Sequence, residues 1–378
     1  MNLLRPAKDN RLISMSFKSR LGILSLVSIV ALIVTATPAT EALTSQHPIQ
    51  RKRIVGTTPP VPRESPTPPT QTSEPEPEVV RVETNLVNTL FTAVDKDRHF
   101  ITTLRAEDVR IFENDVVQPV SLFERETDRP LSLAILVDTS ESQRGVLEDE
   151  KIAARTFIDS VLRPDKDRAA VVSFTGVPKV EQAPTNSLSR LHAGIERVKV
   201  ELPPETIDSE GNSVTNDDDP RGYTSIWDAS WMTIEDLLSK APEGTRRAIV
   251  LLSDGDDTRS TIKKQDVIDF AVRSDVVIYS IGIRDASFSE GKLDSGALQK
   301  VSDRTGGRAF FPSRASELQS VFSQIDQELR SQYLIAYSPT NKNRDGSYRH
   351  IRLEVSNPEL QKNKPQLLYR QGYYAKKS

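Results

Sequence analysis

Apolar and polar residues follow two periods along residues 131–331, and this pattern predicts alternating strands and helices. Continuous apolar runs predict buried strands at 131–137, 168–174, 247–253 and 276–283. Apolar residues recur at helical spacing between and after these runs, at 146–162, 188–198, 226–238, 262–272, 297–305 and 318–329. Strands this apolar are covered on both faces, as in parallel sheets. We therefore expect an α/β fold: a doubly wound, mostly parallel sheet with helices on both faces.

Shorter alternating segments flank this region and predict small β units. Strand-like patterns occur at 80–83, 87–94 and 109–113 before it, and at 333–337, 350–355 and 366–374 after it. We interpret residues 79–130 as a small β domain and 332–378 as a C-terminal β segment. Because each is too short to be stable alone, we hypothesise that they form one sandwich with the 131–331 domain inserted into it. Polar runs predict turns at 95–98 and 114–115, and a hairpin turn at 343–347.

The first 43 residues have the layout of a secretory signal. Five basic residues precede an apolar run at 21–36, and small residues around Ala39 and Ala42 follow it. The run is short for a membrane span, which needs roughly 20 apolar residues. Residues 1–43 are therefore expected to be a cleaved signal peptide, with an uncleaved signal anchor as the alternative. In either case the rest of the chain is expected to be extracytoplasmic: periplasmic, at the cell surface or secreted.

Residues 44–78 predict a disordered, proline-rich linker. Pro, Thr, Ser and Glu dominate this stretch, and it has too few apolar residues to offset the entropy of ordering. The sequence leaves two readings open. The linker either holds the folded part away from an envelope surface or is an idle tail.

Composition and missing motifs exclude several classes of protein. The net charge is −3, so no large cationic field favours nucleic acid. Cysteine is absent and the four histidines are scattered, which argues against disulfide scaffolds, zinc sites and cysteine or histidine catalysis. The sequence also has no phosphate-binding Gly-Lys-Ser/Thr loop and no Gly-x-Ser-x-Gly nucleophile motif. We therefore expect that the protein is not an enzyme.

Oxygen-bearing side chains stand at the ends of the predicted strands. They are Asp138, Ser140 and Ser142 after the strand at 131–137, Asp254 after the strand at 247–253, and Thr224 before the helix at 226–238. In open parallel sheets, ligands bind beyond the carboxyl ends of the strands. Carboxylates with neutral hydroxyls suit a hard divalent cation, Mg²⁺ or alternatively Mn²⁺ or Ca²⁺. Because only a few charged side chains would surround it, such an ion could also bind a carboxylate from a partner.

These motifs resemble those of the von Willebrand factor type A (VWA) domain. The segments LSLAILVDTSES, YTSIWDA and AIVLLSDGDD occur in family order, and the resemblance covers about residues 131–321. It implies a VWA, Rossmann-like fold over 131–331 with a metal-ion-dependent adhesion site (MIDAS). By resemblance, Ser140 and Ser142 are direct ligands, Thr224 is a conditional ligand, and Asp138 and Asp254 hold metal-bound waters.

The layout of residues 80–376 also resembles an acidobacterial subfamily of VWA-related proteins. The shared segments are FTAVDKDRHFITTLRAEDVRIFEND before the domain and QYLIAYSPTNKNRDGSYRHIRLEV with RQGYYA after it. The VWA resemblance implies an adhesion-type protein-binding module whose bound cation engages an acidic group of a partner protein. A structural or assembly subunit of a cell-envelope complex is the alternative. The only membrane contact that we expect is through the N-terminal segment, if it is an uncleaved anchor.

Two further features have competing interpretations. An acidic insert at 201–223 would lie beside the predicted cation site. It could be a specificity loop, a second cation site or a solvated loop, and we favour the solvated loop. Trp227 and Trp231 are four residues apart on one helix face, where they are expected to be core anchors rather than a ligand platform.

Overall fold

The structure is a computed structural model, which describes residues 86–125, 128–202, 205–207, 213–215, 219, 222–284 and 292–377. The chain divides into two units, Met1–Glu78 and Val79–Ser378, and the described residues all belong to the second. The expected signal or anchor at 1–43, the linker at 44–78 and the strand at 80–83 lie outside the described residues. Within the described part, no helix combines the length and the apolar character needed to cross a membrane.

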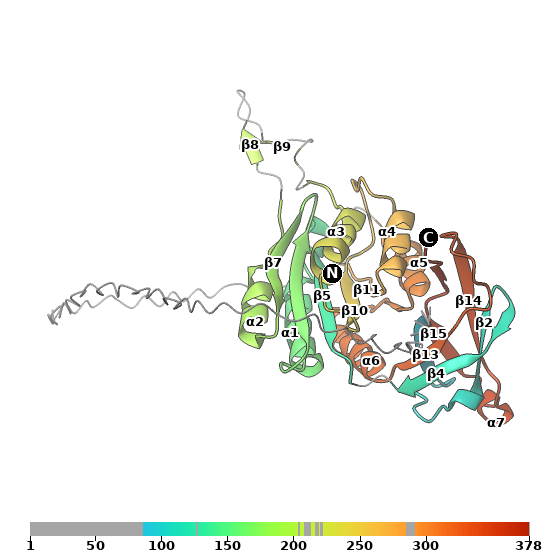
Figure 1. The fold of residues 1–378 in the computed structure, drawn as a ribbon. Helices are drawn as coiled ribbons and strands as arrows, with labels where there is room; N and C mark the ends of the chain where they lie inside the picture. The colour runs from blue at the N-terminus through green and yellow to red at the C-terminus, as the bar shows by residue number, and fades with distance from the viewer. Residues whose placement is uncertain are drawn as a thin grey trace, which may run out of the picture. The chain divides into compact units, whose positions relative to one another are not determined.

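A six-stranded sheet forms the centre of the 131–331 region (Figure 1). Its strands, in spatial order, are β12 (Ala309–Phe310), β11 (Val276–Ile281), β10 (Arg246–Leu252), β5 (Leu131–Asp138), β6 (Arg168–Phe174) and β7 (Pro178–Thr185). All neighbours are parallel except β6 and β7, which are antiparallel. The sequence reading missed β7, whose two prolines are tolerated because it is an edge strand.

Helices cover both faces of this sheet. They are α1 (Leu147–Val161), α2 (Leu188–Arg197), α3 (Ile226–Met232), α4 (Lys264–Arg273), α5 (Ser295–Thr305) and α6 (Leu318–Arg330). Alternate residues of β5 enter opposite cores: Leu133 and Ile135 pack with α1, α2 and α6, and Ala134 and Leu136 with α3, α4 and α5. The expected mostly parallel α/β fold with helices on both faces is thus confirmed. After α3, the predicted helix continues as a π-helical segment, Thr233–Leu238.

The β segments before and after this region form one sandwich, as hypothesised from the sequence. One sheet has the order β15 (Gln366–Tyr369), β1 (Val87–Val94), β13 (Tyr333–Tyr337) and β4 (Val120–Arg125). The other has the order β16 (Gly372–Tyr374), β14 (Tyr348–Val355), β2 (Val109–Glu113) and β3 (Val116–Gln118). Each sheet mixes strands from both ends of the unit, and residues from both sheets share one apolar core. Figure 1 shows these early and late strands side by side.

Two details of the β prediction were wrong. The 343–347 segment is not a hairpin turn, because β13 pairs with β1 and β4 whereas β14 pairs with β2 and β16. The chain there crosses from one sheet to the other. The predicted strand at 366–374 is likewise two strands, β15 and β16, in different sheets. Strand periodicity cannot reveal such crossings, because it does not specify which strands pair.

The two other predicted turns are confirmed. Asn114 and Asp115 join β2 to β3, and both have positive φ angles, 46° and 65°. Asn and Asp tolerate this left-handed conformation better than most residues, and two-residue hairpin loops favour it. The 95–98 turn follows β1 and includes Arg98 at φ 65°. Short elements complete the fold: 3₁₀ turns Ala106–Asp108, Glu141–Gln143 and Ala315–Glu317, helix α7 (Pro358–Gln361), and a two-stranded ribbon of β8 (Glu205–Ile207) and β9 (Ser213–Thr215).

Candidate metal-binding site

The candidate site lies where the neighbouring parallel strands β5 and β10 end. Val137 is opposite Leu252 in the sheet register, so Asp138 and Ser253 emerge side by side. Asp138 is fully buried, and its Oδ2 accepts a hydrogen bond of 2.6 Å from Ser253 Oγ. The loops after these two strands therefore meet at one edge of the sheet.

Four of the five predicted side chains form a continuous chain of contacts. The Ser140 backbone N–H donates to Asp138 Oδ1 at 2.9 Å, and the hydroxyls of Ser140 and Ser142 lie 3.1 Å apart. The Ser142 hydroxyl also interacts with the Asp254 carboxylate and lowers its pKa. Asp138, Ser142 and Asp254 are all buried, and Ser140 is partly exposed. Residues 116 positions apart in the sequence are thus brought into one cluster.

Thr224 is connected to this cluster through its backbone. Its N–H donates to Thr258 Oγ1 at 2.8 Å, and its carbonyl accepts from the Thr258 N–H at 2.9 Å. Thr258 belongs to the loop that begins at Asp254, and the Thr224 side chain is buried. The segment before α3 and the loop after β10 are therefore held together at the site.

Further polar residues that the sequence reading missed fix this pair of loops. Asp257 Oδ1 accepts from the Ile226 N–H at 2.7 Å, and Ser260 Oγ accepts from the Trp227 N–H at 3.0 Å. In return, the Asp228 carboxylate of α3 accepts from backbone N–H groups at 261 and 262, at 3.0 and 2.8 Å. The capping of α3 by Asp257 could not be predicted from the sequence, because Asp257 belongs to a distant loop and is not the residue before the helix.

Burial raises the pKa of both carboxylates of the cluster, Asp138 and Asp254. It raises the pKa of Asp138 to about 7, with a further contribution from the negative charge of Asp254, although hydrogen bonds from Ser140 and Ser253 act in the opposite direction. Burial also raises the pKa of Asp254, opposed by its bond with Ser142 and by the charge of Arg284. Buried carboxylates beside neutral hydroxyls form an oxygen-only donor set. This set fits a hard divalent cation such as Mg²⁺.

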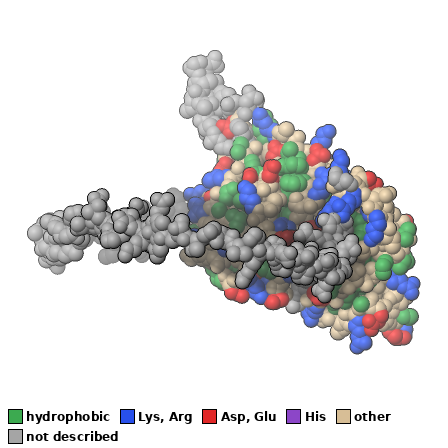
Figure 2. Space-filling model, viewed as in Figure 1, with side chains coloured by type: hydrophobic (Ala, Val, Ile, Leu, Met, Phe, Trp, Pro, Cys, Tyr) green, Lys and Arg blue, Asp and Glu red, His purple; other side chains and the backbone are tan. Residues whose placement is uncertain are grey.

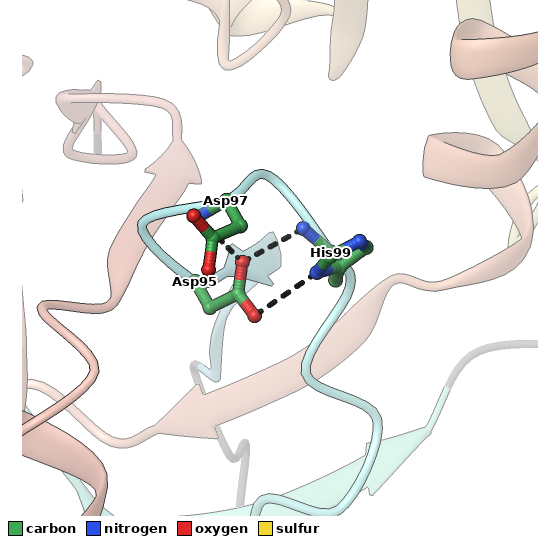
Figure 3. A group of neighbouring side chains, drawn as sticks. All are labelled: Asp95, Asp97 and His99. Carbon is green, nitrogen blue, oxygen red and sulfur yellow. Dashed lines mark hydrogen bonds and ion pairs between the residues drawn. The ribbon is translucent and has the colours of Figure 1, made fainter.

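A second acidic group is exposed and is explained by turn geometry. Asp95, Asp97 and His99 have potential ligand atoms within 4.8 Å of one another. Figure 3 shows that the Asp95 carboxylate faces its own turn, where Oδ1 accepts from the Asp97 and His99 N–H groups, each at 2.9 Å. Oδ2 lies 3.4 Å from His99 Nδ1. This arrangement stabilises the turn after β1 and indicates no ligand.

A cavity lined by described residues lies away from this site. It has a volume of about 510 Å³ and is lined by residues of α4, β14 and β16, including Arg273, Arg349 and Tyr374. It shares no residue with the Asp138 cluster. Over the face drawn in Figure 2, basic and acidic side chains are interspersed.

The remaining sequence predictions near the site have different outcomes. Trp227 is buried in the core, and the partly buried Trp231 packs against the same core and stacks on Phe270 with ring centroids 4.2 Å apart. Both are therefore core residues, as expected. The acidic side chains of the 201–223 insert lie outside the described residues, apart from those of Glu201 and Asp219.

Comparisons with known proteins give one family match and several similar structures. Residues 132–324 match the model of the von Willebrand factor type A domain. The structure resembles BatB from Bacteroides thetaiotaomicron, a conserved hypothetical protein (16% identity, 52% of this chain, 98% of the other, TM-score 0.39). It also resembles a von Willebrand factor type A protein from Catenulispora acidiphila (13% identity, 73% and 74% covered, TM-score 0.43).

A third similar structure is proximal thread matrix protein 1 from the mussel byssus (14% identity, 58% of this chain, TM-score 0.44), of which this chain spans about half, 51%. One structure of that protein has a zinc-occupied MIDAS motif. At these identities and TM-scores the likenesses carry no information about ligand or partner. A search of curated proteins finds no match.

Proposed function

The chain belongs to the von Willebrand factor type A domain family, and we propose that it is an extracytoplasmic, metal-dependent protein-binding module of the adhesion type. In this proposal a divalent cation at the Asp138 cluster engages an acidic group of a partner protein. The main support is the contact chain from Asp138 through Ser140 and Ser142 to Asp254, which gathers oxygen donors at the carboxyl edge of the sheet.

The family pattern assigns a role to each residue of the cluster. Ser140 and Ser142 would bind the cation directly, Thr224 would bind it conditionally, and Asp138 and Asp254 would act through bound waters. The bound cation supplies a positively charged centre that a carboxylate from outside can coordinate. Mg²⁺ is our first choice, and Mn²⁺ or Ca²⁺ would suit the same oxygen donors.

The protein itself supplies the rigidity of this site. The Ser253 hydroxyl orients Asp138, and the backbone bond from Ser140 fixes the other carboxylate oxygen. Asp257 and Asp228 hold the loop after β10 against α3. Such supporting contacts keep ligand side chains oriented, which strengthens cation binding.

Export and the binding role are proposals that rest on the sequence. The signal-like layout of residues 1–43 supports an extracytoplasmic location. The absence of phosphate-binding and nucleophile motifs from the sequence supports a binding protein rather than an enzyme. A structural subunit of a cell-envelope complex is the second candidate. It is favoured by the β-sandwich, whose strands come before and after the VWA domain in the sequence.

Thermal melting with Mg²⁺ or EDTA tests the metal site. A cation that binds only the folded state stabilises it by about 2.7 kcal/mol at a concentration 100 times its Kd. We expect Mg²⁺ to raise the melting temperature of the wild type but not of Asp138→Ala or Ser142→Ala. An equal response of all three proteins would show that the ion binds elsewhere.

Partner capture then separates the two candidate functions. For an adhesion module, a partner retained in Mg²⁺ should be released by EDTA and should not bind Asp138→Ala. A partner that stays bound in EDTA and binds both proteins equally would contradict the adhesion proposal and favour the envelope subunit.

A further inference from the structure

A buried acidic residue interrupts the apolar face of α1. Leu147, Ala154 and Phe157 form a buried stripe on this helix and pack in the core that also contains Val137, the residue before Asp138. Glu150 stands in the same stripe, three residues after Leu147 and four before Ala154, and is 1% exposed. Helical spacing therefore directs Glu150 toward the sheet.

The position of Glu150 along the helix brings it toward the candidate metal site. It is in the first turn of α1, whose N-terminus follows the loop that carries Ser140 and Ser142. Side chains on a helix tilt toward its N-terminus, so the Glu150 carboxylate leans back toward this loop. Burial raises the pKa of Glu150, and the negative charges of Asp138 and Asp254 add to this effect, in agreement with a position near the site.

Neither carboxylate oxygen of Glu150 has a hydrogen-bond partner among the described residues, although both are buried. The neighbouring Lys151 is directed elsewhere, with its Nζ 3.0 Å from Glu148 and 3.7 Å from Glu196. A second buried acceptor, Gln143 Oε1, is also unpaired, while the Nε2 of the same residue donates to Ser142 Oγ at 3.3 Å.

A buried carboxylate without a donor or counter-charge is costly. In the described structure, the carboxylates that act on Glu150 add negative charge rather than compensate it. A divalent cation held at the Asp138 cluster would supply the missing positive charge. The unpaired buried oxygens of Glu150 and Gln143 therefore support a bound cation, as the contact chain of the site does.

We propose that Glu150 is an additional acidic group of the metal site, which holds the cation directly or through a bound water. This inference rests on the proposed function, because it requires a cation at the Asp138 cluster. It adds a third buried carboxylate to those of Asp138 and Asp254. More negative charge around the ion favours cation binding without a partner.

Titration calorimetry of the purified protein with Mg²⁺ and with Mn²⁺ tests this role. Glu150→Gln should bind each metal roughly 10- to 100-fold more weakly than the wild type, which is the usual loss for a supporting group of a metal site. Glu150→Met, of similar size and apolar, should show the same loss. Asp149→Asn is the matched control, since it removes one charge from the same helical turn but at an exposed position.

Melting in EDTA separates this role from a purely structural one. Without metal, Glu150→Gln should melt at or above the wild-type temperature, because a neutral side chain is less costly to bury. Wild-type metal affinity in Glu150→Gln and Glu150→Met would overturn the inference and leave the proposed metal site intact. If the wild type binds neither metal, the metal site itself is refuted, and this inference with it.

Discussion

The hydroxyl of Ser253 donates a 2.6 Å hydrogen bond to the buried carboxylate of Asp138, and this bond joins the ends of the neighbouring strands β10 and β5. Neither residue can turn away without leaving a buried polar group unpaired. The bond therefore fixes the orientation of Asp138, from which the rest of the candidate site extends.

Replacement of Ser253 by Ala should weaken both folding and metal binding. Loss of the donor leaves a buried carboxylate oxygen unpaired, which costs about 1–3 kcal/mol. In urea denaturation with Mg²⁺ present, we expect a decrease of this size in the free energy of unfolding. The rise in melting temperature on addition of Mg²⁺ should also be smaller than in the wild type.

Ser280→Ala is the control for this prediction. Ser280 is equally buried, in the next strand, and its hydroxyl accepts from Ser302 Oγ at 2.9 Å. Its loss should lower stability without changing the response to Mg²⁺. The orienting role of Ser253 would be contradicted if both variants kept the full Mg²⁺ response.

Asp257 and Asp256 are adjacent, but their replacements should have different effects. Asp257→Ala removes the acceptor for the first N–H group of α3, that of Ile226, and should cost about 0.5–2 kcal/mol, as for the loss of a helix cap. Asp256→Ala removes a partly exposed side chain and should change the free energy of unfolding by less than about 0.5 kcal/mol. Equal losses in urea denaturation would show that Asp257 does not act as a cap.

A buried ion pair links an early strand and a late strand of the sandwich. Glu113 of β2 accepts from Arg349 of β14 at 3.0 Å and from the hydroxyls of Tyr337 and Tyr373, each at 2.8 Å. Glu113→Ala would leave the Arg349 charge buried and unpaired, so we expect a loss of about 3–5 kcal/mol. Chemical denaturation measures this loss directly.

Glu354 provides the comparison for this ion pair. Glu354 lies on β14, like Arg349, but its ion pair with Arg352 is roughly half exposed. The side chain of Glu354 is 48% exposed and that of Arg352 is 41% exposed. Glu354→Ala should therefore cost less than about 1 kcal/mol. A Glu113→Ala variant as stable as Glu354→Ala would mean that the buried network does not contribute to holding the two β segments together.

Glu328 should make stability dependent on pH. Burial raises its pKa to about 7, opposed by Arg308, whose Nη2 lies 3.2 Å from Glu328 Oε2. Because the pKa is raised on folding, the folded state binds more protons than the unfolded state between about pH 4.5 and 7. Stability should therefore fall as pH rises through this window.

Comparison with Glu328→Gln isolates this effect. The variant should gain stability over the wild type as pH increases from 4.5 to 8, by an amount on the order of 2–3 kcal/mol. Urea denaturation at several pH values in EDTA measures the difference. A constant difference across this range would show that Glu328 has no raised pKa in the folded protein.

Periodicity in the sequence was sufficient for the α/β region. The continuous apolar strands and the helical spacing between them predicted the sheet and its helices because burial on both faces leaves a strong pattern. The same reasoning missed β7, whose polar edge-strand sequence resembles a loop. It also joined β15 and β16 into one strand, because strand pattern carries no information about pairing.

The sequence by itself determined the five candidate ligands, because Asp138, Ser140, Ser142, Thr224 and Asp254 stand where strands end or a helix begins. Only the tertiary structure decided how they are supported. Nothing in the local sequence indicates the roles of Ser253, Asp257 and Glu150. Ser253 and Asp257 bond to residues that are 115 and 31 positions away in the sequence. The groups that act on Glu150 are carboxylates of other segments. Contacts between distant segments depend on how the strands are ordered in the sheet, and that order is set by packing of the whole unit.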